Sequence, residues 1–137
     1  MSETASLRPP ATRTPQGLLL PRRRVLVVDD DPDTVDSEAT LLELLDQTVR
    51  RAYGGHQALK IAAEFRPELI LLDLEMPTPN GLEVARRMAK EPWRAGCRLI
   101  AHSGSISRYW PEVRQVGFDD FLPKPAELLT LMGILRR

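Results

Sequence analysis

A run of four apolar residues that ends abruptly on a carboxylate constrains the fold of this chain more than any other feature. The run covers residues 69–72, and the carboxylate is Asp73. A short, continuous apolar run is typical of a strand buried on both faces, as strands of parallel sheets are. Asp73 would then lie at the carboxyl end of this strand, where open α/β sheets bind their ligands. Asp73 either takes part in such a site or only caps the next segment, and this stretch leaves both interpretations open.

A second apolar run, residues 25–28, ends on three consecutive aspartates. Adjacent carboxylates repel one another, and a chain that tolerates them usually binds a balancing cation. The alternative is helix capping, because acidic residues and a following proline favour the first turn of a helix. Both can hold, and we expect Asp31 and Asp33 to serve the helix while Asp29 and Asp30 serve the cation.

Segments with apolar positions at helical spacing alternate along the chain with short apolar runs. This alternation predicts an α/β fold with right-handed crossovers. It fits a doubly wound, flavodoxin-like arrangement with a five-stranded parallel sheet in the order 2-1-3-4-5. The second strand has polar positions, so we expect it at an edge. We expect strands at 25–28, 48–52, 69–73, 98–102 and 118–122, a loop at 91–96, and helices at about 33–46, 56–65, 80–90, 108–116 (Pro111 in its first turn) and 126–135.

The chain length of 137 residues predicts a single domain. Residues 1–22 are rich in proline and arginine and lack periodicity, so we expect a disordered tail there and the folded domain at 23–137. Residues 1–24 carry five Arg and one Glu in a chain of zero net charge, so the remainder is mildly acidic. The run Arg22-Arg23-Arg24 is either a docking patch or a solvated charge cluster where a strand begins, and we favour the second.

The composition indicates a cytoplasmic protein without a membrane segment. Cys97 is the single cysteine, so no intrachain disulfide forms, and we expect an inert, partly buried thiol. No apolar run reaches the length of a transmembrane helix, and the three leucines at 18–20 are too few for a signal peptide. The sequence has no helix-turn-helix pattern or basic recognition helix, so we expect protein partners rather than nucleic acid.

In the expected fold, the carboxyl ends of four strands meet at one edge of the sheet. Hard oxygen ligands at that edge, with room for waters, select Mg²⁺ or Mn²⁺. A carboxylate beside a divalent ion and a lysine is a plausible nucleophile for phosphoryl transfer, in which positioning and charge neutralisation supply most of the rate. The side chains expected there are Asp29, Asp30, Asp73, Ser103 and Lys124.

The order and spacing of four stretches resemble the receiver domain of two-component response regulators, over residues 24–136. The stretches are residues 25–31, residues 71–77 with Asn80-Gly81, Ser103-Gly104, and Lys124-Pro125. The resemblance implies that Asp73 accepts a phosphoryl group from a histidine kinase or a histidine phosphotransfer protein. It also implies that Asp29, Asp30, Asp73 and the backbone carbonyl of Glu75 hold Mg²⁺, directly or through water.

The resemblance also implies a conformational switch. The hydroxyl of Ser103 would move toward the phosphoryl group, together with Lys124, and the aromatic ring of Phe121 would follow. A protein-interaction surface would change as a result. The Lys124-Pro125 bond is expected to be cis. Glu75 and Ser105 match positions that flank the attacking water and tune dephosphorylation.

Some residues depart from the family pattern. Ser103 replaces the commoner threonine and keeps the hydroxyl, and Gly104 replaces a commoner alanine. His102 is unusual there: it is either a second group at the phosphate site or, as strand alternation favours, directed to the opposite face from Ser103. Trp110 belongs either to the core or to a partner surface.

Three readings of the activity follow. We expect a phosphoacceptor switch rather than an enzyme, acting as a monomer or weak dimer, either alone or as the receiver of a hybrid histidine kinase. A degenerate receiver that only binds proteins is disfavoured by the intact Asp73, acidic pair and Lys124. A phosphohydrolase of the haloacid dehalogenase type needs its nucleophile on the first strand and a second acid two residues later, whereas Asp73 lies on the third.

Overall fold

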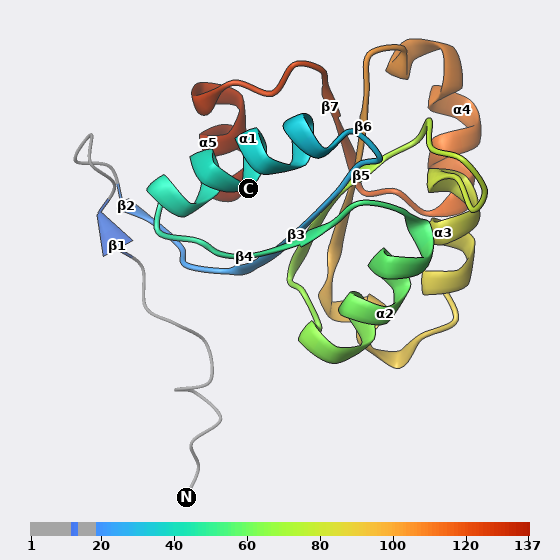
Figure 1. The fold of residues 1–137 in the computed structure, drawn as a ribbon, viewed down its shortest axis with the longest axis horizontal. Helices are drawn as coiled ribbons and strands as arrows, with labels where there is room; N and C mark the ends of the chain where they lie inside the picture. The colour runs from blue at the N-terminus through green and yellow to red at the C-terminus, as the bar shows by residue number, and fades with distance from the viewer. Residues whose placement is uncertain (1–11, 14–18) are drawn as a thin grey trace, which may run out of the picture.

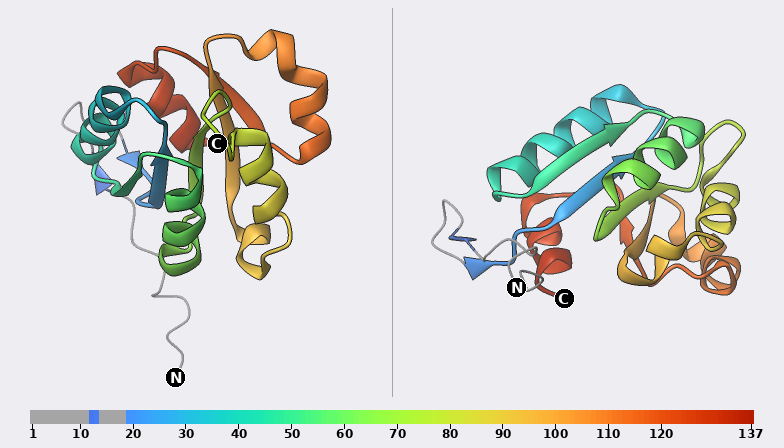
Figure 2. Two further views of the ribbon diagram at one scale, coloured as in Figure 1. Left: turned by 45° about the vertical axis from the view of Figure 1, so that its right-hand side comes forward. Right: turned by 90° about the horizontal axis from the view of Figure 1, so that it is seen from below.

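The computed structural model of this chain describes residues 12–13 and 19–137. Its main feature is a parallel sheet covered by helices on both faces (Figures 1 and 2). The five-stranded sheet has the order β4-β3-β5-β6-β7, and all its pairings are parallel. This is the predicted order 2-1-3-4-5, so the expected fold class is confirmed. The strands are β3 (Arg24–Val28), β4 (Thr48–Ala52), β5 (Leu69–Asp73), β6 (Arg98–Ser103) and β7 (Asp120–Pro123).

Two helices cover one face of the sheet and three cover the other (Figure 2). Helices α1 and α5 pack on the first face, and α2, α3 and α4 on the second. Because both faces are covered, central strands have no polar side, and every residue of β5 is buried. The helices are α1 (Pro32–Leu44), α2 (Gly55–Phe65), α3 (Gly81–Met88), α4 (Ile106–Val116) and α5 (Leu128–Arg136).

Strand β5 shows how the apolar run in the sequence builds both halves of the core. Leu69 and Leu71 pack in the cluster beneath α1 and α5, whereas Ile70 and Leu72 pack in the cluster beneath α2, α3 and α4. All four side chains are at most 1% exposed. The strand therefore runs through the centre of the molecule and carries Asp73 to the edge of the sheet.

The packed region extends further toward the N-terminus than residue 23, where we expected it to begin. Strand β2 (Leu19–Leu20) pairs with β1 (Thr12–Arg13) in antiparallel fashion, and Leu20 is fully buried in the core beneath α5. The buried amide of Gln47 donates to the carbonyl oxygen of Pro21 at 3.0 Å, which fixes the chain there. The rest of the predicted tail, residues 1–11 and 14–18, lies outside the described residues.

The arginine run has a structural role that neither of our two interpretations included. The guanidinium of Arg22 donates to the carbonyl oxygen of Asp46 at 3.2 Å, and that of Arg24 donates to the carbonyl oxygen of Arg66 at 3.0 Å. Asp46 and Arg66 are the two non-glycine residues with positive φ among those described, at 63° and 51°. The arginines thus satisfy carbonyl groups in two turns where the chain reverses direction.

Some boundaries differ from the sequence predictions. Helix α4 begins at Ile106 rather than 108, so Pro111 lies inside the helix and not in its first turn. The expected loop at 91–96 contains a short 3₁₀ helix, η2 (Pro92–Gly96). Strand β7 begins at Asp120 rather than 118. Just before it, Asp119 already binds Leu99 of β6, because its backbone amide donates to the Leu99 carbonyl oxygen at 2.8 Å and its carboxylate accepts from the Leu99 amide at 2.8 Å.

Candidate functional site

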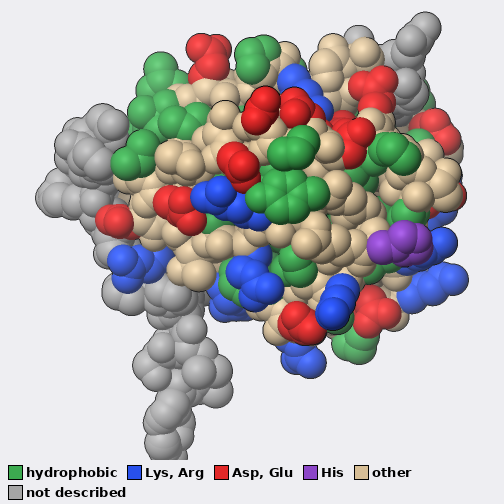
Figure 3. Space-filling model, viewed as in Figure 1, with side chains coloured by type: hydrophobic (Ala, Val, Ile, Leu, Met, Phe, Trp, Pro, Cys, Tyr) green, Lys and Arg blue, Asp and Glu red, His purple; other side chains and the backbone are tan. Residues whose placement is uncertain are grey.

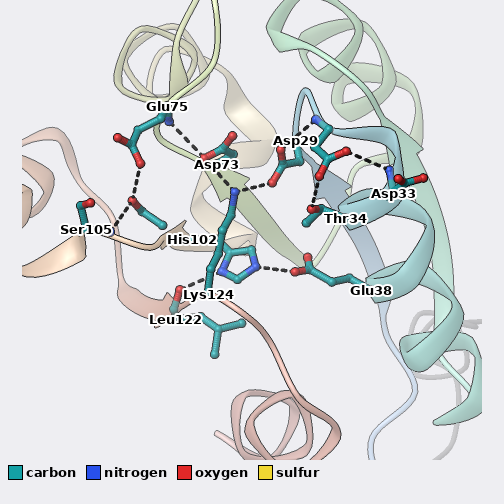
Figure 4. Close-up of polar contacts among 12 residues, drawn as sticks. Asp29, Asp33, Thr34, Glu38, Asp73, Glu75, His102, Ser105, Leu122 and Lys124 are labelled. Atoms are coloured by element: carbon teal, nitrogen blue, oxygen red, sulfur yellow. Dashed lines mark hydrogen bonds and ion pairs between the residues drawn. The ribbon is translucent and has the colours of Figure 1, made fainter.

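Four of the residues expected to meet stand at the carboxyl edge of the sheet, and Figure 4 shows the side chains of Asp29, Asp73 and Lys124 pointing toward one another. Asp29 directly follows β3, Asp73 ends β5, Ser103 ends β6, and Lys124 directly follows β7. The first three are at most 2% exposed, and the side chain of Lys124 is 28% exposed. The fifth expected residue, Asp30, is exposed beside them. Acidic side chains gather in the upper half of the molecule in Figure 3, the half in which these strands end.

Lys124 joins the two buried carboxylates. Its ammonium Nζ lies 2.6 Å from Asp29 Oδ2 and 3.3 Å from Asp73 Oδ1. Burial opposes ionisation of Asp29, but the hydrogen bond and charge of Lys124 hold the pKa of this carboxyl below its usual range. Burial likewise opposes the charge on Lys124, and the two carboxylates raise the pKa of the ammonium in spite of it. The Lys124-Pro125 bond is cis, as expected, and so is the Thr78-Pro79 bond, which the sequence analysis did not anticipate.

Asp73 is the carboxylate whose ionisation is most strongly opposed. Burial raises its pKa to about 6, and the negative charge of Asp29 adds to this effect. The backbone amide of Glu75, which donates to Asp73 Oδ1 at 3.1 Å, and the ammonium of Lys124 counteract only part of it. A further cation at this edge would favour the ionised carboxylate.

We expect Asp73→Asn to stabilise the fold at neutral pH when no divalent cation is present. Because the pKa of Asp73 is raised, the folded state prefers the protonated form, and this preference is lost as the pH rises through about 6. Above that pH the buried charge costs free energy that the amide does not. The unfolding free energy should therefore rise by about 1–3 kcal/mol at pH 7.5. Denaturant unfolding with a chelator measures this, and the gain should shrink at pH 4; no gain at pH 7.5 would contradict the electrostatic account.

The donor set at this edge fits a hard divalent cation. Asp29, Asp30 and Asp73 each offer a carboxylate oxygen, and these oxygens lie within 4.8 Å of one another. Oxygen-only sites that combine carboxylates with open coordination positions suit Mg²⁺ and Mn²⁺. The exposure of Asp30 leaves one side of the cluster open to solvent.

Two local features shape the chain that follows β3 and β5. Asp31 caps α1, because its side chain accepts from the amide of Asp33 at 3.2 Å and from the hydroxyl of Thr34 at 2.8 Å, so the expected role of Asp31 is confirmed. Gly81 begins α3 directly beneath the end of β5. A Cβ there would overlap the carbonyl oxygen of Asp73 and lie 2.7 Å from Leu74 Cα, so only glycine fits this close approach.

The remaining expected site residues lie around Ser103 and on β7. The Ser103 hydroxyl donates to Glu75 Oε1 at 3.1 Å and accepts from the amide of Ser105, also at 3.1 Å. The ring of Phe121 is 39% exposed and meets Trp110 of α4 edge to face, with centroids 5.0 Å apart. Trp110 also packs against the core, so it contributes both to the core and to the surface.

His102 faces away from the phosphate-site candidates, as strand alternation predicted. Its Nε2 lies 2.6 Å from Glu38 Oε2 of α1, and its Nδ1 lies 2.8 Å from the carbonyl oxygen of Leu122. A carbonyl oxygen only accepts, so Nδ1 carries a proton. The two side chains are 1% and 5% exposed, which makes them a buried polar pair.

Glu38 was missed by the sequence analysis, although a signal for it exists. It lies on the same helical stripe as Val35, Ala39 and Leu42, all of which are buried. A carboxylate in an apolar stripe indicates a buried partner. The expectation for Cys97 is confirmed: burial raises the pKa of its thiol to about 12, which makes it inert at neutral pH.

Comparison with known proteins places this geometry in one family. The response regulator receiver domain family matches residues 25–136. The response regulator MprA of Mycobacterium ulcerans is 34% identical over 113 residues, which are 82% of this chain and 48% of that protein. The chain therefore spans about half the length of the curated relatives it matches. Within the described residues, no helix combines the length and apolar character needed to cross a bilayer.

Solved structures of receiver proteins have the same fold as this chain. The chemotaxis protein CheY4 of Vibrio cholerae superposes with a TM-score of 0.81 at 26% identity, covering 85% of this chain and 98% of that one. The receiver domain of the sensor histidine kinase PA1611 of Pseudomonas aeruginosa, which has a magnesium ion in its active-site cleft, gives 0.77 at 26% identity, covering 85% and 96%. The chain belongs to the receiver domains of two-component response regulators.

Proposed function

We propose that this chain is a phosphoacceptor of two-component signalling, in which Asp73 receives a phosphoryl group from a phosphohistidine of a histidine kinase or a histidine phosphotransfer protein. The observation that carries this proposal is the ammonium of Lys124, which lies between the buried carboxylates of Asp29 and Asp73 at an acidic edge of the sheet. Membership of the receiver family supports it. The phosphorylated chain would then present a changed surface to a downstream protein.

The transfer would be an in-line displacement. A carboxylate oxygen of Asp73 forms a bond to phosphorus while the bond from phosphorus to the donor's histidine nitrogen breaks, and that nitrogen keeps the electron pair. Lys124 lies close enough to Asp73 to pair with an equatorial phosphoryl oxygen. Glu75 donates its backbone amide to Asp73 Oδ1, which fixes the orientation of the carboxylate before attack.

The carboxylates of Asp29, Asp30 and Asp73 would hold Mg²⁺ (or Mn²⁺), with the backbone carbonyl of Glu75 as a further protein ligand. Their oxygens lie within 4.8 Å of one another, and the related PA1611 receiver has magnesium in its cleft. The bound ion would supply charge neutralisation for the phosphoryl oxygens. Asp29 and Lys124 together keep the cluster compact, and Asp30 faces the solvent from which the ion arrives.

The output would pass through Ser103 and Phe121 to the surface formed by α4, β7 and α5. The exposed ring of Phe121 and the side chain of Leu129, which is 78% exposed, offer apolar contacts there. We propose a protein target rather than nucleic acid, a monomer or weak dimer, and a cytoplasmic setting. Beyond accepting and losing its own phosphoryl group, the chain would not act as an enzyme. It would work either as a separate receiver or as the receiver of a longer protein such as a hybrid kinase.

Magnesium dependence tests this function. The chain is incubated with acetyl phosphate and Mg²⁺, and its intact mass is followed with time, beside a sample that contains a chelator. We expect one phosphoryl group per chain with Mg²⁺ and at least roughly a hundredfold slower labelling without it. Continuous release of phosphate with many turnovers would instead indicate a phosphohydrolase. No labelling of folded protein that binds Mg²⁺ would favour a receiver that only binds proteins.

A further inference from the structure

The single proton of the Ser103 hydroxyl is already donated in this structure. Ser103 is 0% exposed, and its hydroxyl donates to Glu75 Oε1 at 3.1 Å and accepts from the amide of Ser105 at 3.1 Å. A serine hydroxyl has one proton to donate. Ser103 cannot donate to a phosphoryl oxygen on Asp73 until it releases Glu75.

Glu75 is well placed to respond to the charge on Asp73. Its backbone amide is bonded to Asp73 Oδ1 at 3.1 Å, and its side chain reaches from the loop after β5 to the end of β6. A carboxylate accepts a stronger hydrogen bond from a hydroxyl than a neutral group does. Phosphorylation of Asp73 adds negative charge beside this carboxylate, and like charges repel.

We propose that Glu75 is a latch that holds the Ser103 hydroxyl in its resting position, so that the carboxylate and the phosphoryl group compete for one proton. This inference rests on the phosphoacceptor function proposed above. Glu75 acts here through its side chain and on the switch, as a positioning residue. The competition gives two arrangements: Ser103 bonded to Glu75, or Ser103 bonded to the phosphoryl group with Glu75 displaced. The strength of the latch sets how much phosphoryl binding energy is used to release it.

The affinity for beryllofluoride, a phosphoryl mimic, tests the latch. Calorimetric titration with Mg²⁺ present is done on the wild-type chain, on Glu75→Ala and on Glu75→Gln. Loss of the competing bond should tighten binding by about tenfold in Glu75→Ala. Glu75→Gln keeps the shape and a neutral acceptor, so its affinity should fall between the two. Circular dichroism verifies that each variant is folded.

The Ser103→Ala background separates a latch from simple removal of a negative charge. Without the hydroxyl there is nothing to release, so Glu75→Ala should change the beryllofluoride affinity by less than about threefold in that background. If Glu75→Ala tightened beryllofluoride binding equally in the wild-type and Ser103→Ala backgrounds, Glu75 would act only through its charge, and the latch would be overturned. A beryllofluoride affinity of the single variant Glu75→Ala equal to that of the wild-type chain would also overturn the latch. Absence of binding to the wild-type chain would instead remove the phosphoacceptor function on which the latch rests.

Discussion

Asp73→Asn is expected to lose phosphoryl labelling by acetyl phosphate. The amide is a poor nucleophile and cannot form the acyl phosphate, while its size and burial match those of the aspartate it replaces. Labelling should fall by at least roughly a hundredfold. The intact mass of the protein after incubation with Mg²⁺ and the donor measures the loss directly.

Asp33→Asn is the matched control for this experiment. Asp33 lies in the first turn of α1, exposed to solvent, and contributes its backbone amide rather than its carboxylate to the Asp31 cap. It should label at the wild-type rate within about twofold, since its carboxylate is exposed to solvent and is not one of the three that form the acidic cluster. If Asp73→Asn were labelled as well as this control, another residue would be the acceptor.

His102→Leu is expected to destabilise the fold by about 3–5 kcal/mol, because it leaves the carboxylate of Glu38 buried without its partner. Glu38 Oε1 is already buried without a hydrogen-bond partner among the described residues, so the remaining site cannot compensate. Glu38→Leu should cost less, about 1–3 kcal/mol, since the imidazole keeps its bond to the Leu122 carbonyl oxygen. Denaturant unfolding of each variant gives these values.

The double variant Glu38→Leu with His102→Leu shows whether the pair itself stabilises the fold. Both polar groups are then gone, and the two leucines join the apolar cluster that α1, β6 and β7 share. We expect its unfolding free energy to lie within about 1 kcal/mol of the wild-type value, which is a much smaller loss than the sum of the losses in the two single variants. Additive losses would mean that each side chain has its own partner and that the two do not form a unit.

The sheet and the cluster at its edge could be predicted because their signals are local. The apolar runs at 25–28 and 69–72 determine buried strands, and the alternation with helices determines the parallel order. In that topology the strand ends meet, so Asp29, Asp73 and Lys124 had to lie near one another. The capping role of Asp31 follows from local chemistry in the same way.

The features that escaped prediction depend on contacts between residues far apart in the chain. The partner of His102 is Glu38, 64 residues earlier, and periodicity does not identify such pairs. Leu20 is a tail residue by composition and a core residue by its packing beneath α5. Arg22 and Arg24 look like a charge cluster until the turns at Asp46 and Arg66 supply carbonyl groups for them.

The hydrogen bond between Ser103 and Glu75 is also a contact between residues far apart in the chain. The resemblance to the receiver family relates each residue to the phosphoacceptor, but only the fold brings the two side chains to 3.1 Å from each other. The resting state of the switch therefore had to be read from the structure.

Identification of the labelled residue tests the central claim most directly. Wild-type chain is labelled with acetyl phosphate and Mg²⁺, the acyl phosphate is reduced with borohydride, which converts the modified aspartate to homoserine, and the peptides are sequenced by mass spectrometry. The account predicts homoserine at position 73 and at no other carboxylate. Homoserine at Asp29 or Asp30, or a stable phosphoryl group on His102, would contradict it.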